Sequence, residues 1–212
     1  ELSFAKALSE FAKLNSLEQS AFYNNYRTVY DFLTTAKNKY YEIAKADSEQ
    51  IAREEAAAFV SLNSGILNSD FMTILSVARA STEEEFKSYS DNLTSSYDAL
   101  SSKAKSMLSQ EVLNAVKKAQ ENCKAAERTV KFENRYSTYI GSNYEAVLSK
   151  WQDIHSTDYI FVSEALAAYN ALPEVARNHT TEYEIQLNNL LKLHLFHQLL
   201  LYFLIQLMLL YH

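Results

Sequence analysis

The sequence predicts an all-α protein, a multi-helix bundle with long antiparallel helices, from its turn residues and its periodicity. Only two glycines and one proline occur in 212 residues. Strand-rich folds need many tight turns, and those turns depend on Gly and Pro. Ala, Leu, Glu, Lys and Gln, which favour helices, are frequent instead. Apolar residues also recur at steps of three and four, which places them on one face of a helix.

The clearest pair of elements is a helical hairpin over residues 81–119. Ser81 and Thr82 supply capping hydroxyls, and three glutamates follow them at the positive end of the helix dipole. Ser101 and Ser102 then interrupt the pattern, because serine favours caps over helix interiors. The first arm carries Phe86, Tyr89, Leu93, Tyr97 and Leu100 on one face, and the second carries Ala104, Met107, Leu108, Val112, Ala115, Val116 and Ala119.

The N-terminal part predicts a short helix over 2–14, with a cap at Asn15 or Ser16. From Leu17 to Leu62 there is neither Gly nor Pro. From Phe22 to Ile43 the apolar residues alternate by four and three, the heptad pattern of a helix that lies along a partner. A break is expected at Asp47, and a turn with left-handed Gly65 after Leu62. The heptad seam comprises Phe22, Tyr26, Val29, Leu33, Ala36, Tyr40 and Ile43.

The C-terminal part predicts further helices after Asp70, Ser142 or Asn143, and Pro173. Pro173 suits the first turn of a helix and ends the preceding one. The second arm of the hairpin should end near Gly141, and residues 155–158 should interrupt the helix that follows. The predicted inward residues are Phe71, Ile74, Leu75, Ala78, then Cys123, Ala126, Val130, then Tyr144, Val147, Leu148, Trp151, Ile154, and finally Tyr159, Val162, Ala165, Leu166, Tyr169.

The last residues differ in composition from the rest. Leucine dominates from Leu190 to His212, and Asp, Glu, Ala and Ser are absent there. A membrane span needs roughly 20 apolar residues, and Lys192, His194, His197 and Gln206 interrupt this run. We therefore predict a single helical domain over residues 1–186 and a Leu-rich tail over 187–212. The tail is a membrane anchor, a buried helix or a non-native terminus, and membrane contact through residues 190–211 stays open.

Charge and motifs exclude several functions. The net charge is -6, so the chain lacks the basic surface that nucleic acids need. With two glycines there is no phosphate-binding loop. The residue types of a catalytic triad occur at His155, Ser156 and Asp158, but neighbours in sequence do not form a triad arrangement. We also predict no metal site at the pairs His194/His197 and His179/Glu182. We expect no enzyme activity, no metal and no cofactor.

Cys123 is the one cysteine, so the chain forms no internal disulfide. Its core spacing predicts a buried small side chain. Asn92–Thr94 and Asn178–Thr180 are N-glycosylation sequons. The chain starts at Glu1 without a signal-like segment, as expected after signal-peptide removal or for a fragment. We expect a secreted protein.

Three stretches resemble nematode fatty-acid- and retinol-binding proteins: Thr82–Phe86, Tyr97–Met107 with Val112–Ala119, and Ala167–Arg177. The resemblance covers about Thr82 to Arg177. Residues before Ser81 do not align, and the Leu-rich tail replaces the segment expected after Arg177. The family resemblance implies a secreted, non-catalytic helical protein that encloses a fatty acid or retinoid in an internal apolar cavity.

Helix bundles form such ligand sites between facing helices. The same residues also suit an ordinary core. A carboxylate headgroup would call for a cation such as Lys103, Lys105 or Arg177. The alternative function is a protein-interaction or antigen-like bundle without a cavity, which contacts a partner through helix faces with Tyr23 and Tyr41 outward. The predicted ligand-binding residues are Phe86, Tyr89, Tyr97, Leu100, Met107, Leu108, Val112, Val116, Leu166 and Tyr169.

Overall fold

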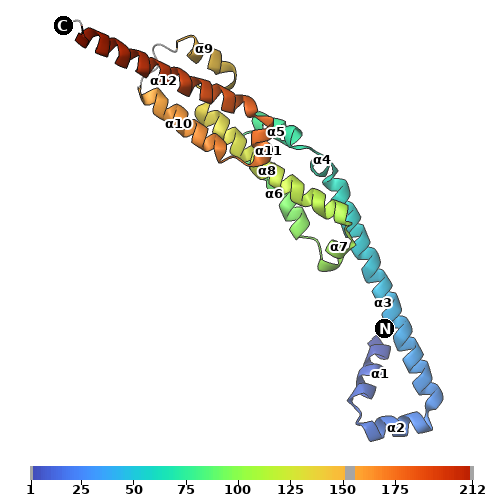
Figure 1. Ribbon diagram of the computed structural model, residues 1–212. Helices are drawn as coiled ribbons and strands as arrows, with labels where there is room; N and C mark the ends of the chain where they lie inside the picture. Colours follow the sequence, from blue (N-terminus) through green and yellow to red (C-terminus); the bar gives the residue numbers. More distant parts are fainter. Residues whose placement is uncertain (1, 151–155, 211–212) are drawn as a thin grey trace. The chain divides into compact units, whose positions relative to one another are not determined.

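Helices form nearly all of the described chain. The computed structural model describes residues 2–150 and 156–210 (Figure 1). These ranges contain helices and no strand, so the all-α prediction is confirmed. The chain divides into two compact units. Unit 1 comprises residues 1–58 and 100–108, and unit 2 comprises residues 59–99 and 109–212.

Unit 1 contains two short helices, most of one long helix, and one short segment from later in the chain. Asn15 begins the second helix as predicted: its side chain accepts the Glu18 N–H at 3.0 Å, and the Glu18 carboxylate accepts the Asn15 N–H at 2.9 Å. This reciprocal capping satisfies two N–H groups that the helix leaves unpaired. The elements are α1 (Leu2–Lys13), α2 (Ser16–Asn25), α3 (Arg27–Leu62) and α7 (Ser102–Met107).

Aromatic rings hold α1, α2 and the start of α3 together. Phe11 of α1 lies 5.5 Å from Phe22 of α2 and 5.3 Å from Tyr30 of α3, between ring centroids. Both pairs are edge-to-face, a geometry that aromatic quadrupoles favour. The side chains of Phe4 and Leu8 on α1 lie outside the described residues.

The predicted break at Asp47 is wrong, because α3 runs through it without interruption. Asp47 is exposed, so its carboxylate stays in water and has no need to cap a new helix. No Gly or Pro weakens the helix there. The interruption lies instead at Tyr26, between α2 and α3, where the backbone leaves helical geometry at φ -133° and ψ 40°.

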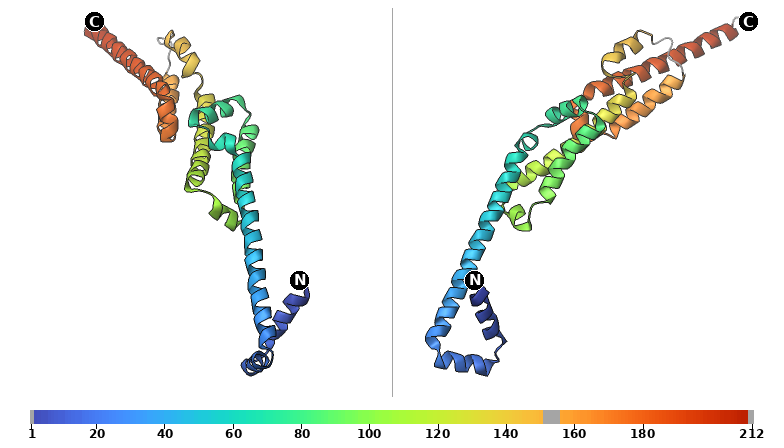
Figure 2. Two further views of the ribbon diagram at one scale, coloured as in Figure 1. Left: turned by 90° about the vertical axis from the view of Figure 1, so that its right-hand side faces the viewer. Right: turned by 180° about the vertical axis from the view of Figure 1, so that it is seen from behind.

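Unit 2 is arranged around α8. Helices α4, α5, α6, α10 and α11 pack against α8, and α10 and α12 lie side by side (Figures 1 and 2). The elements are α4 (Ser64–Leu67), α5 (Phe71–Ala80), α6 (Glu83–Asp98), α8 (Gln110–Tyr136), the 3₁₀ turn η1 (Gly141–Asn143), α9 (Tyr144–Leu148), α10 (Ser156–Asn170), α11 (Glu174–His179) and α12 (Thr181–Leu210).

Several predicted helix starts are confirmed. Asp70 caps α5 by accepting the Thr73 N–H at 2.8 Å. Thr82 and Glu85 form a capping box at the start of α6. Pro173 directly precedes α11. These side chains act locally, so their effect can be read from the sequence.

The hairpin prediction is wrong in its second arm. Instead of one helix there are two, because α7 ends at Met107 and Leu108 is extended. Ser109 then caps α8 by accepting the Val112 N–H at 3.3 Å. The left-handed glycine was also misplaced. Gly65 lies within α4, while Gly141 has φ 61° at the turn that follows α8.

The core of unit 2 confirms most predicted inward residues. Cys123 is buried, as expected. Trp151, Ile154 and His155 lie outside the described residues. The residues of α8 that are buried include Val116, Ala119, Cys123, Ala125, Ala126 and Thr129, and from neighbouring elements Phe71, Ile74, Leu75, Ala78, Leu93, Tyr144, Val162, Ala165 and Tyr169 are also buried.

The predicted start of the Leu-rich tail at residue 187 falls within α12. The first half of α12 is packed through Tyr183, Leu187 and Leu190, which are buried. Among the described helices, α12 is the one that is long and apolar enough to cross a membrane, over Thr181–Leu209. Its second half is exposed.

Removing a core side chain next to α8 should destabilise the protein strongly. Leu75 is fully buried on α5, so Leu75→Ala leaves a cavity, and we expect a loss of about 2–5 kcal/mol in the free energy of unfolding. Urea denaturation followed by circular dichroism measures it. Leu62→Ala is the matched control, because Leu62 is 84% exposed. Equal losses in the two variants would contradict this packing.

Candidate functional site

The ten predicted ligand-binding residues do not all belong to one unit. Leu100, Met107 and Leu108 belong to unit 1. The other seven, Phe86, Tyr89, Tyr97, Val112, Val116, Leu166 and Tyr169, belong to unit 2. Their burial differs as well, since Met107 is exposed while Val116 and Tyr169 are buried.

Most of the seven in unit 2 make packing contacts. Tyr97 lies against Phe59, with ring centroids 5.8 Å apart. Tyr169 is 5.9 Å from Phe132, and its hydroxyl donates to the Arg177 carbonyl at 2.9 Å. Val116 is buried on α8, while Val112 and Leu166 are half-buried.

Tyr89 lines a groove of about 420 Å³ at the surface of unit 2. The end of α3, α4 with the loop after it, α5 and α6 form its walls. Buried Ile66 and Leu93 supply apolar surface, and Leu62 stands exposed at its edge. The lining residues are Leu62, Asn63, Gly65, Ile66, Ser69, Thr73, Val77, Tyr89, Asn92 and Leu93.

The polar groups of this groove are amides and hydroxyls. No Lys, Arg, His, Asp or Glu is among its lining residues. The Asn63 amide donates to the Phe59 carbonyl at 2.9 Å and accepts from Ser96 Oγ at 3.4 Å, which holds it in place. Burial raises the pKa of the Tyr89 phenol. The groove therefore suits an uncharged molecule with an apolar body.

Of the residues that line the groove, Tyr89 is the only one that the sequence predicts as a ligand-binding residue. Leu93 was recognised as an inward residue of the same helix, and the segment around Gly65 only as a turn. The groove forms where α4, α5 and α6 pack together. The residue pattern within each helix does not predict how the three helices pack. The predicted site residue Phe86 lines a smaller hollow of about 80 Å³ together with Ala78 and Lys131.

The predicted cations do not line the groove. Lys103 belongs to unit 1, where its ammonium donates to Ser48 Oγ at 2.9 Å. Lys105 also belongs to unit 1. Arg177 lies on α11, and its Nε is buried without a hydrogen-bond partner. A carboxylate in the groove would meet none of these three side chains.

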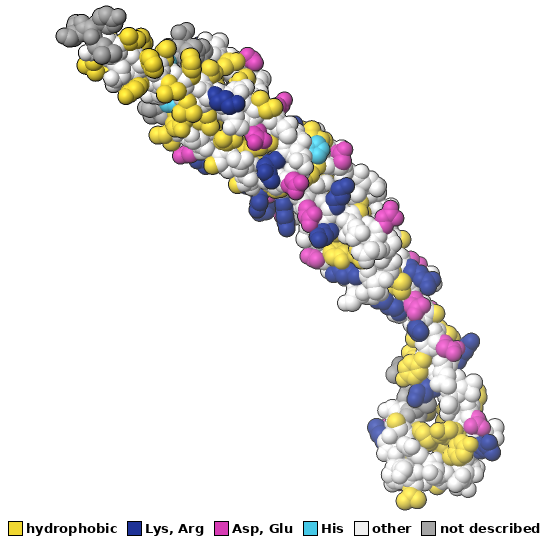
Figure 3. Space-filling model, viewed as in Figure 1, with side chains coloured by type: hydrophobic (Ala, Val, Ile, Leu, Met, Phe, Trp, Pro, Cys, Tyr) yellow, Lys and Arg dark blue, Asp and Glu magenta, His cyan; other side chains and the backbone are white. Residues whose placement is uncertain are grey.

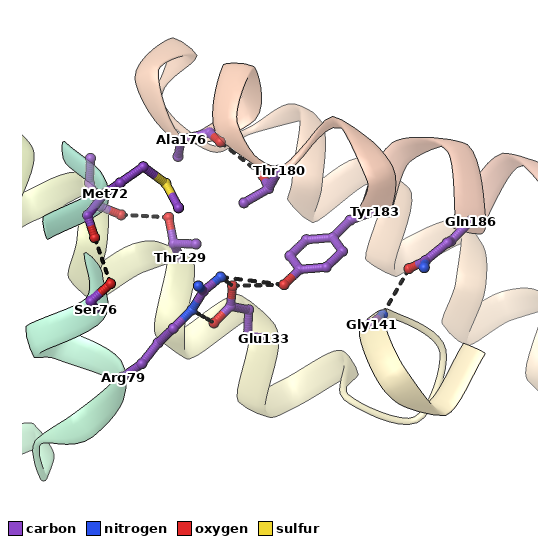
Figure 4. A network of polar contacts seen from close by, with 11 residues as sticks. Met72, Ser76, Arg79, Thr129, Glu133, Gly141, Ala176, Thr180, Tyr183 and Gln186 are labelled. Atoms are coloured by element: carbon purple, nitrogen blue, oxygen red, sulfur yellow. Dashed lines mark hydrogen bonds and ion pairs between the residues drawn. The ribbon is translucent and has the colours of Figure 1, made fainter. Parts of the chain in front are cut away.

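A polar cluster joins α5, α8 and α12 in unit 2 (Figure 4). Arg79 donates to both oxygens of Glu133, at 2.5 Å and 3.0 Å, and the Tyr183 hydroxyl donates to Glu133 Oε1 at 3.0 Å. Next to it, the Gly141 N–H donates to Gln186 Oε1 at 2.8 Å. Charge-assisted, two-pronged bonds of this kind fix orientation. The cluster therefore fastens the first half of α12 to the core.

Burial raises the pKa of Tyr183 to about 12, and the nearby Glu133 carboxylate adds to the effect. Burial also raises the pKa of Tyr139 to about 12, with a contribution from the bond that its hydroxyl donates to Asp158 at 3.0 Å. Both phenols stay protonated in the folded chain at a pH where an unfolded chain would lose the protons.

The histidine pairs stay without a metal-binding arrangement in the described residues. No group of three or more His, Cys, Asp or Glu side chains is placed to hold a metal ion there. His194 is buried, and its ring stacks on Tyr159 with centroids 4.5 Å apart. His179 Nδ1 is within hydrogen-bond distance, 2.8 Å, of the Val175 carbonyl. His179 is thus held by its own helix, whereas His194 packs on Tyr159 and its Nδ1 is buried without a hydrogen-bond partner.

The chain matches no known family model, no curated protein and no solved structure.

Replacing Tyr183 should weaken the attachment of α12 and change the response to alkaline pH. We expect Tyr183→Phe to lose about 0.5–1.5 kcal/mol at pH 8, because Glu133 loses a donor. A raised pKa stabilises the folded state below the ordinary pKa of 10.0, and this contribution disappears as pH rises to about 12. The variant should therefore lose less stability than the wild type between pH 10 and 12.

Urea unfolding at pH 8, 10 and 11.5 tests both expectations. Tyr202→Phe is the control, because Tyr202 lies on the same helix with 62% of its surface exposed. Tyr139 leaves a residual pH dependence in every variant. A pH dependence of Tyr183→Phe identical to that of the wild type would show that Tyr183 does not titrate in this way.

Proposed function

We propose that this protein is a non-catalytic carrier that binds a small hydrophobic ligand, of the fatty-acid or retinoid class, in the groove between α4, α5 and α6. The supporting observation is the groove itself. Its volume of about 420 Å³ falls within the range of roughly 300–1,000 Å³ typical of ligand sites. Apolar side chains, with a few amides and hydroxyls, line it, the usual composition of such sites.

The proposal places the ligand in a surface groove rather than in an enclosed cavity. The ligand's apolar body would lie on Ile66, Val77 and Leu93, where it displaces water from apolar surface. The Tyr89 phenol and the Asn92 amide offer hydrogen bonds to a polar end. Only Tyr89 is retained from the ten residues that the sequence suggested.

The groove should prefer an alcohol to a carboxylate. A carboxylate that loses water needs a paired cation or several donors, and no cation is among the lining residues. An alcohol makes its hydrogen bonds with amides and hydroxyls at a smaller cost. Retinol or a long-chain alcohol should therefore bind more tightly than a fatty acid of equal length.

Secretion is part of this proposal. Asn92 and Asn178, the two sequon asparagines, are both exposed and accessible to a glycan. Asn92 lies at the groove, so a glycan there would cover part of it. Binding is best measured on bacterially expressed protein, in which Asn92 is unmodified.

A second candidate function is a protein interaction through α3, which an exposed seam favours. Val29, Tyr40 and Ile43 of the predicted heptad seam are exposed, and the neighbouring Phe32 is exposed as well. Tyr41 is exposed, as the sequence suggested, whereas Tyr23 packs edge-to-face on Tyr30 at 4.9 Å.

Lysines flank this seam. Lys37 and Lys39 lie on its two sides, at the positions that set partner choice in coiled coils. Asp31 and Glu42 lie on the opposite side of the helix. The charge pattern suits a partner helix with an apolar seam and acidic flanks.

Filling the groove should abolish ligand binding without unfolding the protein. We expect Asn92→Trp to weaken retinol binding at least tenfold, because the indole occupies the groove. Asp91→Trp is the matched control, since Asp91 is exposed on the opposite side of α6 and does not line the groove. The measurement is a fluorescence titration with retinol, hexadecanol and palmitate competing.

The site assignment is wrong if Asn92→Trp binds as the wild type does, or if both tryptophan variants lose binding equally. Palmitate binding more tightly than hexadecanol would contradict the preference for an uncharged polar end. Circular dichroism confirms that each variant is folded before the titration.

The α3 seam should discriminate between designed helical peptides by charge. We expect a peptide with a leucine heptad seam and glutamate flanks to bind, and the same peptide with lysine flanks not to bind. The double variant Lys37→Glu/Lys39→Glu should reverse the preference, while Lys45→Glu, away from the seam, should leave it unchanged. Fluorescence anisotropy measures binding, and equal affinity for both peptides would count against the seam.

A further inference from the structure

The second half of α12 presents apolar side chains in every direction. The seven consecutive residues from Leu199 to Ile205 are between 42% and 68% exposed. Because successive helical residues are about 100° apart, seven in a row cover the full circumference. Figure 3 shows apolar side chains gathered at this end of α12. We refer to Leu195–Leu209 as the apolar end of α12.

The core of unit 2 holds the first half of α12, whereas the large apolar side chains of the apolar end are exposed. Tyr183 bonds Glu133, Gln186 accepts the Gly141 N–H, and Leu187 and Leu190 are buried. His194, stacked on Tyr159, is the last buried residue of the helix in the described chain. The boundary between the two halves therefore lies close to His194.

We propose that the apolar end of α12 inserts into a lipid bilayer. A protein groove or a second helix covers one face of a helix, and a helix that is apolar all round needs an apolar solvent on every side. Within the span from Thr181 to Leu209, an 18-residue window reaches a mean hydropathy of 1.4. From Leu193 to Leu209 the sequence contains no Asp, Glu, Lys or Arg, so no such charged side chain of this stretch has to enter the hydrocarbon.

The polar residues at its base fit this orientation. Lys192 is exposed just before the apolar end, and a lysine at such a position can reach the headgroups while its stem stays apolar. The apolar end is about 22 Å long at 1.5 Å per residue, against a hydrocarbon thickness of about 30 Å. It therefore reaches well past the bilayer midplane. The bundle stays at the surface, because α12 is one continuous helix fastened to it.

This inference rests on α12 alone and does not depend on ligand binding in the groove. The two can fail separately. Charged substitutions in the apolar end should abolish membrane binding and leave retinol binding intact. Asn92→Trp should have the opposite effect.

Two variants of the protein, each with one added cysteine that carries a fluorescent label, test the insertion. The full chain carries Leu204→Cys or Ile185→Cys, each labelled with an environment-sensitive fluorophore. Native Cys123 is buried and does not react. Ile185 is the matched control, because it is exposed on the packed half of the same helix. Phosphatidylcholine vesicles should shift the emission at residue 204 to the blue with a several-fold gain in intensity, and leave residue 185 unchanged.

Vesicle co-sedimentation completes the test. The wild type should sediment with the vesicles, and Leu200→Glu/Leu204→Glu should stay in the supernatant while remaining folded by circular dichroism. An unchanged emission at residue 204 overturns the proposal. So does a label at residue 204 that is already shifted without lipid in a stable oligomer seen by analytical ultracentrifugation, because a second copy would then cover the apolar end.

Discussion

Small side chains along α8 are the constraint on which the rest of unit 2 depends. Ala119, Cys123, Ala125 and Ala126 are buried in the middle of this helix. The distance between packed helices follows the size of the side chains at the contact, so these positions let the neighbouring helices approach closely. Helices α4, α5, α6, α10 and α11 all pack against α8, and α12 packs against α10. A larger residue there would move both sites at once, because tightly packed cores transmit strain.

The sequence predicts what depends on neighbours along the chain. The caps at Asn15, Asp70 and Thr82 and the restart at Pro173 use residues within one turn of the helix end, and the structure has them as expected. The buried face of α5 also follows from its spacing. These features can be predicted without knowing which other helices pack against the element.

The failures have a common cause, because each depends on competition between alternatives. Asp47 has the residue type of a cap, yet a continuous helix keeps all its backbone bonds while that carboxylate is in water. Ser109 looks like an ordinary surface position of a long helix, yet it starts a new one. The groove is harder still, because Leu62, Asn63 and Thr73 become neighbours of Tyr89 only when three helices meet. The residue pattern of a single helix does not predict these contacts between helices.

The two halves of α12 show how burial and exposure are decided by partners rather than by composition. Leucine is abundant in both halves, and the backbone is helical throughout. The first half has partners, since Tyr183 and Gln186 place it on the core and Leu187 packs beneath. Beyond His194 the large apolar side chains of the helix are exposed.

A carrier and an apolar helix end are physically compatible in one unit. Molecules that suit an apolar groove are themselves concentrated in bilayers, because transfer from water into an apolar phase is favourable. A protein that must take such a molecule from water is limited by its low free concentration. If both proposals hold, an apolar end that reaches the bilayer would bring the proposed carrier to the phase where its ligand is abundant. Unit 2 contains both the groove and α12, so the proposed membrane contact and the proposed ligand uptake involve the same unit.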